Sequence, residues 1–151
     1  MVKSRPKRDV GGNTMKASAA TAALVERLFR TFESGDASAI PDLFAEEGPV
    51  LGIGTDPTEW WSGRERLLQV VTAQVGELAG TKVDMGDVEA YEVGDLGWGA
   101  ARPTFTFPDG NSFVGRLTVV SAKSGDEWRL VQFHLSVGVA NDEAVGRELT
   151  T

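Results

Sequence analysis

The second half of the chain is a series of alternating runs separated by glycine-containing turns, and this pattern constrains the fold more than any other feature. Strand-like runs occupy 83–93, 98–107, 113–123 and 127–139. Two of the turns between them, 108–110 and 124–126, are short and contain Gly with Asp, which is typical of hairpins. Because such short connections cannot carry crossover helices, the pattern predicts an antiparallel meander.

Helical spacing dominates the first half. Apolar residues recur on one face of a segment from 17 to 32, which predicts an amphipathic helix. A second helix is predicted over 37–44, and a third runs from Ser62, as N-cap, to about residue 75. A short strand at 50–53 lies between them. Helices followed by a meander indicate an α+β fold with the helices on one side of the sheet.

The 151 residues fit one domain. The absence of cysteine excludes disulfides and thiolate chemistry, and the single histidine excludes a histidine-rich metal site. No apolar run reaches the roughly 18 residues needed to cross a bilayer, and no start resembles a signal peptide. We therefore expect a cytoplasmic protein with no membrane association and no cofactor.

Charge is distributed unevenly along the chain. Residues 1–16 carry five basic side chains and one acidic side chain, so the remainder holds ten basic and twenty-one acidic ones, a net charge of −11. An acidic body repels phosphate backbones, which argues against nucleic acid as a partner. We expect 1–16 to be a disordered basic leader, 17–141 to be the folded domain and 142–151 to be a C-terminal tail.

Three cationic side chains are predicted to form a row across the last three strands. A three-residue loop at 124–126 places Arg116 opposite His134, and a three-residue loop at 108–110 places Arg102 opposite Arg116. Two neighbouring arginines repel each other unless an anion lies between them. A carboxylate ligand satisfies them, because Arg binds carboxylates through two hydrogen bonds.

Trp98 and Gln132 share the face of this cationic row, and together they have the mixed apolar and polar character of a ligand pocket. Two other interpretations stay open. The same face can form a sheet-to-sheet dimer interface, where Trp and Arg are enriched. Alternatively, Asp56 and Glu59 from the preceding loop can neutralise the arginines. A single β-bulge would change the register on which the row depends.

The loop before the third helix carries further candidates. Asp56 and Glu59, with His134, form a conceivable acid–base set in which a carboxylate abstracts a proton. The adjacent Trp60 and Trp61 suggest one core anchor and one residue at a lid or interface, and either can contact a bound ligand. The alternative, in which the two carboxylates have no functional role and are capping or solvated groups, remains open.

The order of these elements resembles the SnoaL-like proteins of the nuclear transport factor 2-like superfamily, and the resemblance covers about residues 20–141. Three segments carry it: the opening 24–44, with its Ser-Gly-Asp and Leu-Phe-Ala; GIGTDPTEWWSGRERL at 52–67; and the final strand at 128–136. The middle segment resembles one SnoaL-like subgroup. The final strand is also similar to that of the association domain of calcium/calmodulin-dependent kinase II.

The resemblance implies a cone-shaped α+β roll of the cystatin-like type. Three N-terminal helices close the mouth of a strongly curved, mixed, mainly antiparallel sheet, and the protein is usually dimeric. In some relatives the cone holds the substrate of an isomerase, cyclase or dehydratase, which uses an Asp or His there. In the kinase association domain a cavity arginine binds small carboxylates, and Arg116 is its loose counterpart.

These observations lead to three functional expectations. The first is a homodimeric protein that binds a small organic ligand with carboxylate or carbonyl groups in the cone. The second is an isomerase, cyclase or dehydratase acting on a polyketide-like or hydroxylated substrate, with His134 as acid or base. The third is a non-catalytic dimerisation module. The expected ligand-binding residues are Arg102, Arg116, His134, Trp60, Trp61, Trp98, Gln132, Asp56 and Glu59, with no metal ligand among them.

Overall fold

The computed structural model describes residues 9–10 and 13–151. Most of the predicted basic leader therefore lies outside the described residues. Lys16, its last residue, begins the short strand β3 (Lys16–Ala17), which pairs with β7 (Glu89–Val93). Within the described residues, no helix is long and apolar enough to cross a membrane.

Three of the helical segments form close to where their periodicity predicts, although the second is divided into a 3₁₀ turn and a short helix, and α4 (Asn141–Val145) was not predicted. The others are α1 (Ala19–Ser34), the 3₁₀ turn η1 (Ala37–Ala39), α2 (Ile40–Leu43) and α3 (Arg64–Glu77). The Ser18 hydroxyl accepts a hydrogen bond from the Thr21 amide and begins α1, and Gly35 ends it with a φ of 70°. The predicted role of Ser62 as an N-cap is wrong. Ser62 pairs with Leu51 in the sheet, and Gly63 precedes α3 instead.

The strands of the described chain build one mixed, mainly antiparallel sheet of nine strands, while β1 (Asp9–Val10) and β2 (Asn13–Thr14) pair only with each other in a separate two-stranded sheet. In addition to β3 and β7, the strands of the large sheet are β4 (Leu51–Ile53), β5 (Trp60–Ser62), β6 (Lys82–Asp84), β8 (Leu96–Ala101), β9 (Thr104–Thr106), β10 (Ser112–Ser124) and β11 (Glu127–Val137). The main order is β3-β7-β8-β10-β11-β4-β5, and β9 pairs with both β10 and β6. Only the β11–β4 pair is parallel among these strand pairs.

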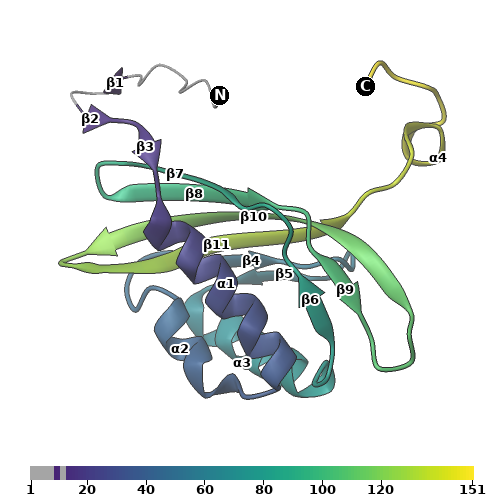
Figure 1. The fold of residues 1–151 in the computed structure, drawn as a ribbon, viewed down its shortest axis with the longest axis horizontal. Coiled ribbons are helices and arrows are strands. Elements are labelled where there is room, and N and C mark those ends of the chain that lie inside the picture. Colours follow the sequence, from purple (N-terminus) through teal and green to yellow (C-terminus); the bar gives the residue numbers. More distant parts are fainter. Residues whose placement is uncertain (1–8, 11–12) are drawn as a thin grey trace.

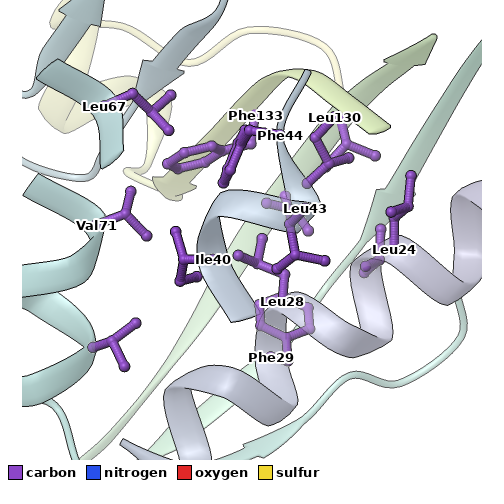
Figure 2. Packing of buried hydrophobic residues seen from close by; sticks show 14 of the residues in the cluster. Leu24, Leu28, Phe29, Ile40, Leu43, Phe44, Leu67, Val71, Leu130 and Phe133 are labelled. Atoms are coloured by element: carbon purple, nitrogen blue, oxygen red, sulfur yellow. The ribbon is translucent and has the colours of Figure 1, made fainter. Parts of the chain in front are cut away.

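The helices α1, α2 and α3 all lie against one side of the curved sheet (Figure 1). We call the side of the sheet that they cover the inner face and the opposite side the outer face. The core lies between the helices and the inner face. In Figure 2, side chains from α1, α2 and α3 point toward Leu130 and Phe133 of β11. Burial of this apolar surface is the main stabilising contribution to the fold.

The register of β10 and β11 differs from the prediction at two points. The hairpin turns on Gly125-Asp126 alone, so that Ser124 pairs with Glu127. The register then shifts by one residue at Val131, which has no partner on β10. The shorter turn sets Leu130 opposite the buried Ser121, and the β-bulge then changes the alternation of the residues that follow, among them His134. Leu130 therefore faces the core, rather than sharing a face with His134.

The two differences add to a slip of two residues. The prediction that Arg116 lies opposite His134 is therefore wrong, since Arg116 pairs with Ser136 and His134 pairs with Thr118. An even slip keeps both residues on the same face. The predicted loop at 108–110 is confirmed, because the Phe107 amide donates to the carbonyl of Asn111, at 2.8 Å.

Candidate functional site

An apolar cavity of about 290 Å³ opens between α1, α3 and the inner face of the sheet. Its walls come from elements far apart in the sequence, namely α1, the β4–β5 hairpin, α3 and the strands β9, β10 and β11. The residues that line it are Leu28, Phe29, Phe32, Gly54, Thr55, Glu59, Trp61, Gln74, Glu77, Leu78, Thr81, Phe105, Phe107, Phe113, Leu117, Phe133 and Leu135. Its size lies just below the range of about 300–1,000 Å³ typical of ligand pockets.

Aromatic rings dominate the walls. Every phenylalanine of the chain except Phe44 lines the cavity. Phe105 stacks on Phe113 with ring centroids 4.7 Å apart, and Phe29 meets Phe105 edge to face at 5.8 Å. Such ring pairs hold one another in place. The cavity therefore has flat, apolar walls, and none of these phenylalanines was among the predicted site residues.

Glu59 brings a carboxylate into this apolar lining. Its Oε2 accepts a long hydrogen bond, 3.4 Å, from Nε2 of Gln74 on α3. A Cβ atom at Gly54 would lie only 1.8 Å from Glu59 Oε2 and 2.9 Å from the Trp61 ring. The glycine at position 54 is therefore required for the carboxylate to lie where it does.

Asp56 and Glu59 lie on the same β4–β5 hairpin but have different surroundings. The amide and hydroxyl of Thr58 donate to Oδ1 of Asp56, at 2.9 and 2.6 Å. These bonds, the hydroxyl first, lower the pKa of Asp56. Asp56 is exposed and is absent from the lining of the cavity, whereas Glu59 is part of it. Asp56 therefore shapes the turn that presents Glu59.

The adjacent tryptophans divide as predicted. Trp61 is buried, with 6% of its surface exposed, and its ring lies 6.1 Å from that of Phe133 in the cavity wall. Trp60 is 64% exposed. Because successive strand residues point to opposite sides, Trp60 lies on the outer face, where its strand neighbour is Ile53.

The predicted cationic row lies on the outer face. Arg102 and Arg116 line a separate, open hollow that also contains Asp87 and Glu89. His134 lies on the neighbouring strand β11, opposite Thr118 of β10. None of the three cationic residues lines the apolar cavity. Their predicted roles in ligand binding remain predictions. They now concern the outer face of the sheet and not the cone cavity, where a carboxylate ligand was expected.

Two further predicted residues also lie on the outer face. Gln132 pairs with Val120, and Trp98 pairs with Tyr91, with ring centroids 6.1 Å apart. Within the part of the chain that the structure describes, no group of three or more His, Cys, Asp or Glu residues is placed to hold a metal ion. The structure therefore brings only Glu59 and Trp61 of the predicted set into the cavity.

Gln74 was missed by the sequence interpretation, and so was Thr81. Gln74 lies on the cavity side of α3 and bonds Glu59. Thr81 is 2% exposed, and its hydroxyl has no hydrogen-bond partner among the described residues. A polar residue among apolar positions of the third helix was the available signal for Gln74, and no signal in the sequence marked Thr81.

The fold and the cavity define a class of protein: a cone-shaped α+β roll that encloses a small apolar chamber between its helices and its sheet. Within this class, residues 22–140 match the model of the SnoaL-like domain family. The match spans well over half of the chain, and the chain belongs to this family. The resemblance seen in the sequence is confirmed. A search of curated proteins found no match.

Solved structures share the fold at low sequence identity. An NTF2-like protein of unknown function from Pseudomonas putida KT2440 is 16% identical, with a TM-score of 0.72, covering 85% of this chain and 94% of the other. A proposed NTF2-like dehydratase from Streptomyces avermitilis is 18% identical, with a TM-score of 0.69 and coverages of 80% and 96%.

A third structure relates to the kinase resemblance. A proposed calcium/calmodulin-dependent protein kinase II association domain from Xanthomonas campestris is 20% identical, with a TM-score of 0.66, covering 89% of this chain and 95% of the other. At these identities the likeness establishes the fold alone. The cystatin-like, cone-shaped α+β fold predicted from the sequence is confirmed.

Proposed function

We propose that this protein binds a small, largely apolar organic molecule in the cone cavity, with a polar group of the ligand held at Glu59 and Gln74. The observation that carries the proposal is the lining itself. Aromatic and aliphatic walls surround a carboxylate and an amide that contact each other, Glu59 and Gln74, and Glu77 is the second carboxylate of the lining. A mainly apolar pocket with few convergent polar groups is the usual form of a small-molecule site.

The charges of the lining residues limit which polar group the ligand can carry. All lining residues belong to the described part of the chain, and none of them is Lys, Arg or His. A carboxylate ligand would therefore meet the Glu59 carboxylate without a compensating cation. A carbonyl group is compatible with the site, because the Gln74 amide is a hydrogen-bond donor.

The test is a cavity-blocking variant. Leu135 lines the cavity from β11, and Leu135→Phe places additional ring atoms inside it. Ligand-observed NMR screening of small organic molecules is expected to give hits with the unmodified protein that disappear with Leu135→Phe. Val137→Phe is the matched control, since Val137 is two residues further along the same strand, is exposed and lies outside the lining. Hits that survive Leu135→Phe would place binding elsewhere.

A second candidate is catalysis in the same cavity, as an isomerase, cyclase or dehydratase. The observation that favours it is the Glu59 carboxylate among apolar walls, where a base can abstract a proton away from bulk water. The likeness to a proposed dehydratase is consistent with this candidate. Glu59, rather than His134, is the base that the cavity offers.

Catalysis is tested with a panel of cyclic β-hydroxy ketones, whose dehydration to enones is followed by ultraviolet absorbance. The expected result is turnover that Glu59→Gln abolishes and His134→Gln leaves unchanged. Turnover that persists in Glu59→Gln would remove Glu59 as the base.

The cytoplasmic location of the protein stays a prediction.

We further propose that the protein forms a homodimer through the outer face of its sheet. No helix of the described chain covers the main part of this face (Figure 1). It carries Trp60, Trp98, Tyr91 and Ile53, all at least partly exposed. Aromatic residues on an uncovered sheet face are typical of protein interfaces.

A further inference from the structure

We infer that the ligand of the cone cavity is an organic cation, an ammonium group carried on an apolar body. This inference rests on the proposed ligand-binding function and specifies the chemical class of the ligand. It combines two independent features of the lining, namely its charges and its aromatic rings.

The charged groups of the lining have one sign. Glu59 and Glu77 are its only ionisable residues, and both are acidic. In the described part of the chain, no basic side chain forms an ion pair with either of them. A partly buried carboxylate without a cation is unfavourable unless a charged or hydrogen-bonding partner is supplied. An ammonium ligand supplies that partner at Glu59.

The aromatic walls favour the same charge. Six phenylalanine rings and the Trp61 ring line the same cavity as Glu59, and both the Glu59 carboxylate and the Trp61 ring lie close to Gly54. The faces of aromatic rings carry partial negative charge and attract ammonium groups within about 6 Å. Cages of aromatic rings with a nearby carboxylate are a common way to bind substituted ammonium ions. Aliphatic walls would accommodate an apolar body equally well but would not select its charge.

The negative charge of the whole domain also favours a cationic ligand. Residues 17–151 carry a net charge of −11, and an acidic surface raises the local concentration of cations and accelerates their association. A carboxylate ligand would be repelled by both the domain and the cavity. The domain charge acts at long range and is screened by salt, whereas the lining acts at contact and is screened much less.

The experiment compares three ligands of nearly the same shape: 3-phenylpropylammonium, 3-phenylpropan-1-ol and 3-phenylpropanoate. Isothermal titration calorimetry at neutral pH and 150 mM salt measures the dissociation constant of each. The ammonium ion is expected to bind about tenfold more tightly than the alcohol, and the carboxylate is expected not to bind detectably. In Glu59→Gln, the ammonium ion should lose about tenfold in affinity, while the alcohol stays within about twofold.

Glu65→Gln is the matched control, because Glu65 is exposed in the first turn of α3 and lies outside the lining. It removes the same charge from the domain, and it should leave the affinity for the ammonium ion within about twofold. If Glu59→Gln fails to fold, Glu77→Gln replaces it, and a weaker but selective loss for the ammonium ion is expected.

The outcomes separate the two proposals. If the alcohol binds as tightly as the ammonium ion, or the carboxylate binds most tightly, the cation inference is overturned and the ligand-binding function stands. If Glu59→Gln and Glu65→Gln weaken ammonium binding equally, the lining is not the cause, and the inference is again overturned. If none of the three ligands binds, the cation inference is overturned, and the ligand-binding function is decided by the NMR screen with Leu135→Phe.

Discussion

Two buried threonines differ in what their hydroxyl groups contact. The Thr21 hydroxyl bonds Ser18 Oγ at 2.9 Å and Ser121 Oγ at 2.8 Å, and Ser18 in turn donates to Glu92 at 2.8 Å. The Thr81 hydroxyl has no partner among the described residues. A bonded hydroxyl and an unbonded hydroxyl contribute to stability with opposite sign, because burial without a hydrogen bond is unfavourable.

Replacing each threonine by the near-isosteric valine therefore gives opposite results. Thr21→Val removes the hydrogen bond recorded for the buried Ser121 hydroxyl and one of those of Ser18, and it is expected to destabilise the fold by about 1–3 kcal/mol. Thr81→Val removes an unpaired hydroxyl and is expected to be neutral or stabilising by about 1 kcal/mol. Urea unfolding measures both free energies. A clear loss of stability in Thr81→Val would show that its hydroxyl is bonded in solution.

The pH dependence of the β4–β5 hairpin follows from Asp56. Hydrogen bonds from Thr58 lower the pKa of Asp56 below its ordinary 3.8. The folded state therefore binds this proton less tightly than the unfolded state. The contribution to stability is present above about pH 3.8 and is lost as the pH falls through the lowered pKa of the folded state.

Thr58→Val removes the larger of the two causes, the hydroxyl, and keeps the amide. The pKa of Asp56 is expected to move back toward 3.8 in an NMR titration of the side-chain carboxyl. Asp36 serves as an internal control, because its lowered pKa has a different cause, the hydrogen bonds from Ser38. An unchanged pKa of Asp56 in the variant would mean that the hydroxyl bond is absent in solution.

The residue types in the sequence predicted part of the candidate site. Which of these residues line the cavity depends on the directions of their side chains. The pair Trp60-Trp61 was interpreted as one core anchor and one lid or interface residue in a loop, and the anchor is Trp61. The structure places both in the strand β5, whose alternation separates them. Asp56 and Glu59 were grouped from their shared loop. Their different surroundings depend on a turn closed by Thr58 and on the space at Gly54, and neither feature is visible as a pattern in the sequence.

At the scale of elements, Arg64 connects α3 to the end of α2. Its guanidinium donates to the carbonyls of Phe44, Ala45 and Pro41, at 2.7, 2.9 and 3.0 Å. Carbonyls at the end of a helix lack partners within the helix. A planar guanidinium can reach several of them at once, whereas the ammonium group of a lysine cannot reproduce that geometry.

Arg64→Lys is therefore expected to lower the free energy of unfolding by about 1.5–3 kcal/mol, although the charge is kept. Chemical denaturation measures the loss. The control is Arg66→Lys, since Arg66 is exposed and its recorded hydrogen bond is to Gln69 on the same helix. Equal effects of the two variants would show that the contact with α2 adds nothing.

Register was the least predictable property of the elements. The meander and its order follow from alternation and turn residues, which act locally. The bulge at Val131 leaves no mark in composition, because β-branched residues suit regular strands equally well. The shorter turn moved Leu130 into the core, and together with the extra residue in β11 it moved His134 out of line with Arg116.

At the scale of the molecule, the class of fold was predictable and the location of the cavity was not. Helices followed by a meander indicate α+β, and the resemblance to the SnoaL-like family supplies the cone. A curved sheet has two faces, and the polar one was expected to line the cavity. The structure places the apolar face inside and the cationic residues Arg102 and Arg116 outside, because the helices must bury apolar surface.

The outer face then becomes the place where a second copy is expected to bind. Val120 lies near the middle of this face, between Trp98 on β8 and Gln132 on β11. In a twofold dimer the same patch is contributed by both subunits. Val120→Glu would bring two like charges into an apolar contact, which costs several kcal/mol.

Sedimentation velocity at micromolar concentration is expected to show a dimer for the unmodified protein and a monomer for Val120→Glu. Ala73→Glu adds the same charge at an exposed position on α3, on the helical side of the molecule, and should leave the dimer intact. Circular dichroism establishes that both variants are folded. A monomeric unmodified protein, or dissociation by both variants, would contradict assembly through the outer face. The cavity faces the helices, so ligand binding should persist in the monomer, and that result would separate assembly from recognition.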